Sequence, residues 1–404
     1  MPPYWALSIL LCGCFCGAAM ASASKAGAPP PAHDKQSLCL DILVSGHVQA
    51  YVDFFYLTHR PEVEQDAAAE AEEEQVGVPS NMLPHVKTQL EEAEVARRRG
   101  DTQAVFAAYR QLADFFTGLE DQRTAIYFWE KCLEITQLTS DVESEKQATR
   151  SLGMAHEASK DMAAAIKQYE TLLDLTKATS DVGGAQQANE HLVVGYEAIA
   201  ASRDAAGDPH GALECREKCL EAARASGDPA KERKAHFDLG QAHEKLGGME
   251  HLKKAVAHYE SNLTLAQKAD ETEAQGAAAY ALAQTYQRLQ DGEKSLGYLK
   301  QFLRLAQASS SARAQAEACC SLGVLYNTQG DYSSAVQYLE RFFELARAVG
   351  DRALVDKART YLGIARGNSV LPQYTKVVTN DLNGLLSWKN RRTPFTSQLS
   401  IGQQ

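Results

Sequence analysis

The chain has 404 residues and 45% of them are apolar, so it can bury either one large core or a succession of small ones. Its 41 basic and 52 acidic residues give a formal net charge of −11. That balance argues against a nucleic-acid partner, because a basic surface supplies most of the affinity for phosphate groups. No apolar run reaches the roughly 20 residues of a membrane-spanning helix, so we expect no membrane partner.

Residues 1–34 combine an apolar stretch with a segment rich in Ala, Ser and Pro. The stretch at 5–19, followed by small residues, is typical of a secretory signal. Two features oppose that interpretation: no Lys or Arg precedes the apolar run, and Met20 begins a plausible cytosolic start. We favour the start at Met20, while a start at Met1, with a cleaved signal or an uncleaved apolar tail, stays open. The segment after Met20 predicts disorder.

Two short regions follow. Residues 35–60 predict one or two amphipathic helices rich in aromatic side chains, such as Tyr51 and Phe54. Residues 61–82 predict an acidic linker, because seven acidic residues and no basic ones lie between Glu62 and Glu74. A solvated linker is the default interpretation of such a run, and docking of a basic partner is the alternative.

A sequence pattern, called the phrase below, then recurs with a period of about 40 residues. In one copy, Leu-Gly at 152–153 is followed by His156, Ala165 and Tyr169. The small residue of the phrase recurs at positions 113, 153, 193, 240, 283, 323 and 363, with spacings of 40, 40, 47, 43, 40 and 40. A small residue on a first helix lets a second helix approach closely, and the aromatic residues fill the space between them.

This phrase resembles the tetratricopeptide repeat, although 40 residues exceed its usual length of about 34. The resemblance predicts an all-α solenoid of about seven helix pairs over residues 83–366, with residues 367–404 as a capping segment and tail. Gly or Ser followed by Asp, as at Ser140-Asp141 and Gly330-Asp331, marks the turns, because the first ends a helix and Asp caps the next. We expect the extra residues of the two long spacings to lengthen turns, at 203–211 and 247–252.

No pattern of catalytic or metal-binding residues is present. The nine cysteines lack zinc-site spacing, and phosphate loops and hydrolase motifs are missing, so we expect no enzyme activity, cofactor or metal. Cys215 and Cys219 are interpreted as packing residues, with a metal or redox pair as the alternative. His156 and His243 are likewise assigned to packing. The sequon at Asn262 falls within a second helix, and we expect it to carry no glycan.

The candidate binding surface is the concave face lined by the first helices. Positions just after each small residue, and three before it, predict the side chains that face a bound protein segment. They are Arg110, Asp114, Arg150, Met154, Glu190, Gln241, Tyr280 and Gln284. A clamp for a C-terminal carboxylate, as in chaperone-binding repeats, is disfavoured because Asp114 stands where that clamp has Asn.

Segments outside the generic phrase resemble the ciliary and flagellar family of tetratricopeptide repeat protein 29. They are Cys39–Leu43, Phe128–Ile135 and Leu382–Lys389, the last outside the repeats. The resemblance implies a non-enzymatic scaffold of the cytoskeleton, in the axoneme of the cilium or flagellum. Its implied partners are a single-headed inner-arm dynein heavy chain and companion subunits, with intraflagellar transport particles or tubulin as further candidates. Two alternatives remain: a cytosolic cargo adaptor resembling kinesin light chains or LGN-type scaffolds, and a secreted repeat protein.

Overall fold

A computed structural model describes residues 35–58 and 78–391. The predictions for residues 1–34, for the acidic stretch up to residue 77 and for the tail from residue 392 lie outside these ranges. The chain divides into two compact units, and the boundary between them falls at Lys160 and Asp161.

The first unit contains six described helices. They are α2 (Lys35–Val44), α3 (Val48–Thr58), α4 (Leu83–Arg99), α5 (Thr102–Gly118), α6 (Gln122–Thr139) and α7 (Val142–Ala158). Helices α2 and α3 pack on α4, where the backbone N–H of Ala50 donates to the carboxylate of Glu94 at 2.9 Å. The core of this unit is apolar and includes the fully buried Ile42, Phe54, Leu112 and Phe128.

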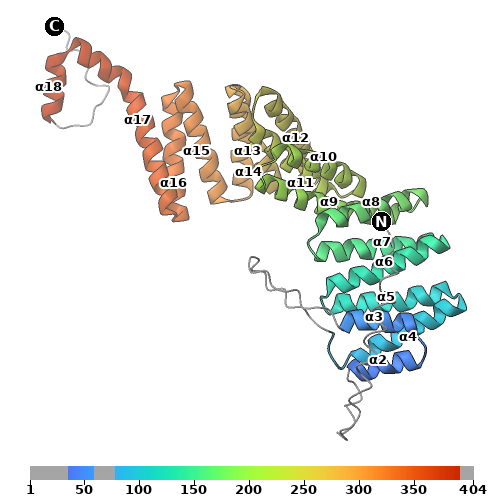
Figure 1. The fold of residues 1–404 in the computed structure, drawn as a ribbon. Helices are drawn as coiled ribbons and strands as arrows, with labels where there is room; N and C mark the ends of the chain where they lie inside the picture. Colours follow the sequence, from blue (N-terminus) through green and yellow to red (C-terminus); the bar gives the residue numbers. More distant parts are fainter. Residues whose placement is uncertain (1–34, 59–77, 392–404) are drawn as a thin grey trace, which may run out of the picture. The chain divides into compact units, whose positions relative to one another are not determined.

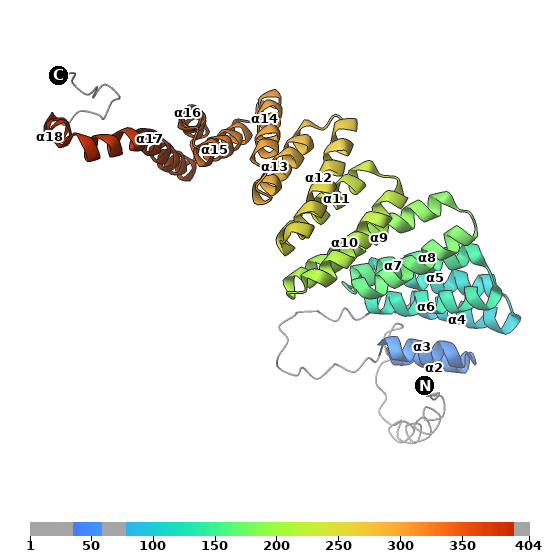
Figure 2. The same cartoon turned by 90° about the horizontal axis from the view of Figure 1, so that it is seen from above.

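The second unit is itself a succession of helices (Figure 1). It contains α8 (Met162–Ala178), α9 (Val182–Ala205), α10 (Pro209–Ser226), α11 (Pro229–Leu246), α12 (Met249–Lys268), α13 (Thr272–Arg288), α14 (Gly292–Ala308), α15 (Ala312–Gln329), α16 (Tyr332–Val349), α17 (Arg352–Asn380) and α18 (Leu382–Arg391). Each helix from α8 to α17 packs on the next along the chain, and Figure 2 shows the same succession of pairs from above. All regular elements in the described residues are helices, which confirms the predicted all-α solenoid of helix pairs.

The turns between helices repeat one local geometry. A residue in the left-handed region ends a helix, as at Ser140 (φ 55°) and Gly330 (φ 83°). The next residue is usually Asp, and its side chain accepts a hydrogen bond from a backbone N–H of the following helix. Asp331, for example, accepts from the N–H of Ser334 at 3.1 Å. These caps satisfy N–H groups that the helix itself leaves unpaired, so the predicted start and stop signals are confirmed.

The small residues of the repeat permit close helix approach, as expected. A Cβ added at Gly240 would lie 2.4 Å from the ring of Tyr259, and one at Gly323 would lie 2.5 Å from Leu339. The final copy differs, because a Cβ at Gly363 would meet nothing within 4 Å. Close packing therefore requires glycine at positions 240 and 323, on α11 and α15, but not at position 363 on α17.

The expected position of the extra residues was wrong. Helix α9 has 24 residues and α12 has 20, whereas α8, α13 and α14 have 17 each. The turn after α9 stays short, with Gly207 in the left-handed region and Asp208 as the cap of α10. Seven extra residues complete about two helical turns, so the packing face of α9 keeps its phase. The insertions therefore lengthen helices and not turns.

The described chain ends in a long helix and a short one. Helix α17 has 29 residues and carries Pro372 in its interior. The Trp388 ring of α18 meets Tyr374 of α17 edge-on, with ring centroids 6.1 Å apart. Several apolar side chains here are at least half exposed: Leu371, Leu382 and Leu386. In the described ranges we find no helix that combines the length and the apolar character needed to cross a bilayer.

Candidate functional site: the first-helix face

In the second unit ion pairs join α11 to α9 and α13 to α11, which are all odd-numbered helices. Lys231 and Lys234 of α11 reach Glu190 and Glu197 of α9, at 3.3 Å and 2.7 Å. Arg288 of α13 reaches Glu244 of α11 at 3.2 Å. We call the surface formed by α9, α11, α13 and α15 in this unit, and by α5 and α7 in the first unit, the first-helix face of each unit.

Four of the predicted site residues lie on this face in the second unit. Glu190, Gln241 and Gln284 are exposed, and Glu190 is held in its ion pair with Lys231. Tyr280 is half-buried, with its ring 5.1 Å from that of Phe302. Burial and the carboxylate of Glu317 on α15 raise the pKa of Tyr280, so it acts as a neutral hydroxyl.

The other four lie on α5 and α7 of the first unit. Asp114 and Met154 are exposed, and Arg110 is half-buried. Burial raises the pKa of Asp114, and the nearby Arg110 opposes that rise. Arg150 is half-buried, and its Nε atom is buried without a hydrogen-bond partner in the described residues. Leaving a buried donor of this kind unpaired costs free energy.

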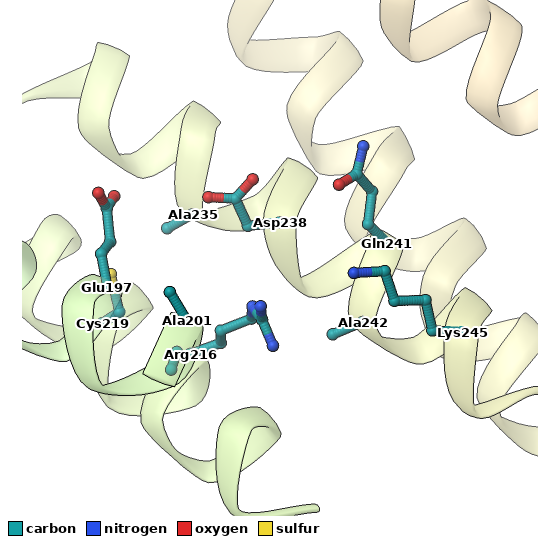
Figure 3. Close-up of a pocket in the computed structure, with 10 residues that line it drawn as sticks. Glu197, Ala201, Arg216, Cys219, Ala235, Asp238, Gln241, Ala242 and Lys245 are labelled. Atoms are coloured by element: carbon teal, nitrogen blue, oxygen red, sulfur yellow. The ribbon is translucent and has the colours of Figure 1, made fainter. Parts of the chain in front are cut away.

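A pocket of about 200 Å³ opens between α9, α10 and α11 (Figure 3). Four alanines and a cysteine alternate with charged or amide side chains in its wall. The lining residues are Glu197, Ala200 and Ala201 from α9, Arg216 and Cys219 from α10, and Ala235, Asp238, Gln241, Ala242 and Lys245 from α11. Of the predicted site residues, only Gln241 belongs to this set.

The two extra turns of α9 build one side of this pocket. A 17-residue α9 would end near residue 198, whereas Ala200 and Ala201 line the pocket from the added turns. Those turns are anchored on α10. Arg203 donates to the carbonyl oxygen of Gly211 at 3.0 Å, and Asp204 forms an ion pair with Arg216. The anomalous spacing of 47 residues therefore marks the pocket in the sequence.

The charges in the pocket are unevenly paired. Glu197 is paired with Lys234, and Arg216 with Asp204. Among the described residues neither Asp238, which is half-buried, nor Lys245 makes a direct ion pair, and the charges of Lys234, Arg216 and Lys245 act on Asp238 from nearby. In Figure 3 the polar ends of Glu197, Asp238 and Gln241 point to the same side, while Arg216 and Lys245 extend toward each other.

The two positions predicted for each first helix miss most of the pocket. Phe237, three residues before Gly240, packs its ring 5.5 Å from Tyr259 and belongs to the core, while its neighbour Asp238 lines the pocket. Glu197 and Lys245 lie one turn beyond the predicted positions, and Arg216 is on a second helix. The signal for this pocket in the sequence was the spacing of 47 residues between positions 193 and 240, where the other copies have about 40.

A second cluster, of four histidines, lies in the α11–α12 hairpin. Nδ1 of His236 is 3.0 Å from Nδ1 of His258, and Nδ1 of His243 is 3.1 Å from Nδ1 of His251. The rings of His243 and His258 are stacked at 5.6 Å, so the four residues form a continuous ladder. Each close N···N distance suits one hydrogen bond, whose direction depends on the tautomers of the two rings. Within the described ranges no group of three or more His, Cys, Asp or Glu side chains is arranged to hold a metal ion.

The remaining candidate residues are in packed positions. The six cysteines of the described residues are buried and free of disulfides, and burial raises the pKa of Cys132 and Cys219 to about 12. Thiols with such pKa values are inert at neutral pH, consistent with a packing role. Asn262 is buried, and its amide donates to the carbonyl oxygen of Arg233 at 2.6 Å. A glycan on that nitrogen is incompatible with this fold.

Comparison with known proteins agrees with the repeat. The tetratricopeptide repeat model matches residues 275–348. A tetratricopeptide repeat protein 29 of Trypanosoma brucei brucei is 31% identical over 116 residues, which is 29% of this chain and 24% of that protein. The match therefore spans about a quarter of that relative.

Several solved helical-repeat structures are similar at low identity. BtubC from P. vanneervenii is 18% identical with a TM-score of 0.42, over 61% of this chain and 97% of that one. A signal-transduction ATPase with a tetratricopeptide repeat sensor from Pyrococcus horikoshii is 14% identical with a TM-score of 0.41, over 87% and 50%. Kinesin light chain-like repeats from Podosopora anserina are 16% identical with a TM-score of 0.34, over 51% and 96%. The family match alone shows that residues 275–348 carry a tetratricopeptide repeat, a fold of protein-interaction scaffolds.

Proposed function

We propose that the chain is a non-enzymatic scaffold whose first-helix faces bind segments of other proteins. The observation that carries this proposal is the presence of unpaired polar groups on the first helices of both units. They include the buried Nε of Arg150 in the first unit and the carboxylate of Asp238 in the second. Polar groups left unpaired in partly buried positions favour a bound partner, because that partner can supply the missing hydrogen bonds.

The proposed setting is the axoneme of the cilium or flagellum. Similarity to the trypanosome tetratricopeptide repeat protein 29 supports it, together with the resemblance of Phe128–Ile135 and Leu382–Lys389 to that family. The proposed partners are an inner-arm dynein heavy chain and its companion subunits, with intraflagellar transport particles or tubulin as further candidates. In this role the scaffold holds a motor subunit in place, so its loss weakens beating without preventing growth of the flagellum.

The test replaces two first-helix side chains in ciliated cells that lack the protein. Arg150→Ala with Tyr280→Ala removes the unpaired guanidinium donor and the half-buried phenol. Anchors of these two residue types contribute about 2 kcal/mol or more each at protein interfaces. We expect the variant to fold, and the inner-arm dynein content of isolated axonemes, measured by quantitative mass spectrometry, to fall to the level of the null cells.

The matched control is Arg304→Ala with Tyr332→Ala, which removes the same residue types from the second helices α14 and α16. It should retain dynein content and motility. Normal dynein content with the first-helix variant would exclude these side chains as the contact. Absence of the tagged wild-type protein from axonemes would exclude the ciliary setting, while leaving binding by the first-helix faces to be measured in solution.

A further inference from the structure

The walls of the pocket between α9, α10 and α11 suit a narrow, flexible apolar chain. Ala200 and Ala201 on α9 face Ala235 and Ala242 on α11, so methyl groups line both sides. A volume of about 200 Å³ accommodates one long side chain and excludes an entire helix. The methylene stem of Lys or Arg buries well against such a surface while its charged end stays at a polar site.

The pocket wall holds two acidic and two basic side chains, and Asp238 is an acid without a direct ion pair in the described part of the chain. Burial raises the pKa of Asp238, and the nearby Lys234, Arg216 and Lys245 only partly oppose that rise, while Glu197 adds to it. Two of these cations are committed elsewhere, because Lys234 pairs with Glu197 at 2.7 Å and Arg216 pairs with Asp204. A half-buried carboxylate without a direct partner is stabilised when a cation comes within hydrogen-bonding distance.

An acidic guest finds a weaker site. The guanidinium of Arg216 is already occupied by Asp204, and Lys245 is an exposed side chain. A carboxylate entering the pocket would also approach Asp238 and Glu197, whose carboxyl groups point to the same side as the amide of Gln241 (Figure 3). Like charges at this distance oppose binding.

We infer that this pocket receives a lysine or arginine side chain from the bound protein segment, with Asp238 as its acceptor. The alanine walls hold the methylene stem, and the carbonyl oxygen of Gln241 accepts a second hydrogen bond. The inference rests on the proposed function, since it specifies what the first-helix face of the second unit binds. In this inference the two extra turns of α9 form one wall of the binding pocket, because they supply Ala200 and Ala201.

The experiment selects a displayed library of random 12-residue peptides on the full-length protein. Enriched sequences are then made as fluorescein-labelled peptides and their dissociation constants are measured by fluorescence anisotropy. We expect one position of the enriched sequences to be Lys or Arg. Its replacement by norleucine, which keeps the stem and removes the charge, should weaken binding on the order of 10- to 100-fold.

Two protein variants locate the effect. Asp238→Asn should weaken the basic peptides to the same extent and leave the norleucine peptide unaffected. Asp238→Lys should reverse the preference, so that a Glu at the selected position binds better than Lys. Asp174→Asn on α8, an exposed acid on a second helix, is the matched control and should change nothing. Circular dichroism and urea unfolding establish that each variant is folded.

The outcomes separate this inference from the proposed function. Peptides that bind a first-helix face, and lose affinity with Arg150→Ala or Tyr280→Ala, but show no basic position and no response to Asp238→Asn overturn the inference alone. A selected acidic position that depends on Lys245 also overturns it. Failure to enrich any peptide, or enriched peptides insensitive to every variant of the first-helix faces, overturns the proposed function itself.

Discussion

Helices α9–α12 and α13–α16 are two consecutive blocks of the same repeat, and they differ in regularity. In α13–α16 the residues that cap the helices fall 20 apart, at 271, 291, 311 and 331, and the helices have 17 or 18 residues. In α9–α12 the helices have 24, 18, 18 and 20 residues. The alanine-lined pocket and the histidine ladder both belong to the irregular block. Both features therefore lie where the helices depart from the regular spacing of the repeat.

The cores of the two blocks also differ at equivalent positions. Tyr286 stacks on Tyr298 at 5.7 Å, and in the next pair Tyr326 stacks on Tyr338 at 5.5 Å. His243 and His258 stack at 5.6 Å in the corresponding place of the irregular block. The stacked arrangement of the two rings is the same in both blocks, but two tyrosines in the regular block are replaced by two titratable histidines in the irregular one. The following four predictions use this contrast.

The largest effect is expected at the glycines of closest helix approach. Gly240→Ala should lower the free energy of unfolding by about 2–3 kcal/mol, because the new methyl group meets the ring of Tyr259 at 2.4 Å. That ring has little freedom to move, since its hydroxyl donates to Glu244 at 3.1 Å. Gly323→Ala should also destabilise the fold, because the new methyl group lies 2.5 Å from Leu339 and 3.3 Å from the carbonyl oxygen of Ala335. Urea unfolding followed by circular dichroism measures both.

Gly363→Ala is the control for these glycines. Nothing lies within 4 Å of its added Cβ, so replacing glycine inside a helix should raise stability by up to about 1 kcal/mol. Equal unfolding midpoints for Gly240→Ala and Gly363→Ala would show that close approach does not limit the packing.

The second effect is acid sensitivity confined to the histidine ladder. Burial lowers the pKa of His258 to about 4 and also lowers the pKa values of His236 and His243. The unfolded histidines have pKa values near 6.5, so the unfolded chain binds more protons as the pH falls. The contribution of these histidines to the free energy of unfolding is therefore present above about pH 6.5. As the pH falls toward 4, the free energy of unfolding decreases by on the order of 2 kcal/mol.

The charges around the ladder act in both directions. Arg224 of α10 lies 3.1 Å from His236 and, with Lys254 of α12, opposes protonation, whereas Glu232 at 3.9 Å favours it. Hydrogen exchange at about pH 7 and about pH 5, corrected for intrinsic rates, should show opening of α11–α12 and not of α15–α16. His243→Tyr with His258→Tyr, which installs the ring pair of the regular block, should reduce the difference, and His236 accounts for what is left. Equal acid sensitivity of both blocks would contradict the assignment.

The third effect concerns a polar residue in a core position. Asn262 stands seven residues after Ala255, where the regular block has Phe302 and Phe342. Asn262→Ala should cost about 1–2 kcal/mol, because it leaves the carbonyl oxygen of Arg233 without its hydrogen bond. The neighbouring Ser261→Ala, whose hydroxyl bonds only within its own helix, should change stability by less than about 0.5 kcal/mol. A glycopeptide recovered from the folded native protein at Asn262 would be incompatible with the buried amide.

The smallest effect on stability is expected at the pocket carboxylate. Because burial raises the pKa of Asp238, its ionised form at neutral pH does not stabilise the fold. Asp238→Asn should therefore leave the free energy of unfolding within about 0.5 kcal/mol of wild type or raise it slightly. Asp331, a helix cap in the regular block, has a lowered pKa because it accepts hydrogen bonds from Ser334. Asp331→Asn should lower stability at neutral pH, and a larger loss with Asp238→Asn would contradict the unpaired state of that carboxylate.

Local signals predicted much of the architecture. The left-handed residue followed by Asp sets both ends of a turn through hydrogen bonds within a few residues, so Ser140-Asp141 and Gly330-Asp331 predicted their turns directly. The small residues of the phrase predicted close helix approach, because a glycine or alanine side chain leaves room for the neighbouring helix. Of the residues predicted to face a bound segment, Gln241 lies on the pocket wall.

The amino-acid sequence by itself determined the helix pairs, their period and the first helices of each pair, since these follow from spacing, capping and side-chain volume along the chain. Only the tertiary structure decided that the seven extra residues extend α9, because their helical state is supported by contacts with α10 through Arg203 and Asp204. It likewise decided which charges are paired. Arg216 is taken by Asp204 and Lys234 by Glu197, which leaves Asp238 without a partner. Such pairing depends on distances between helices, and no local pattern in the sequence encodes those distances.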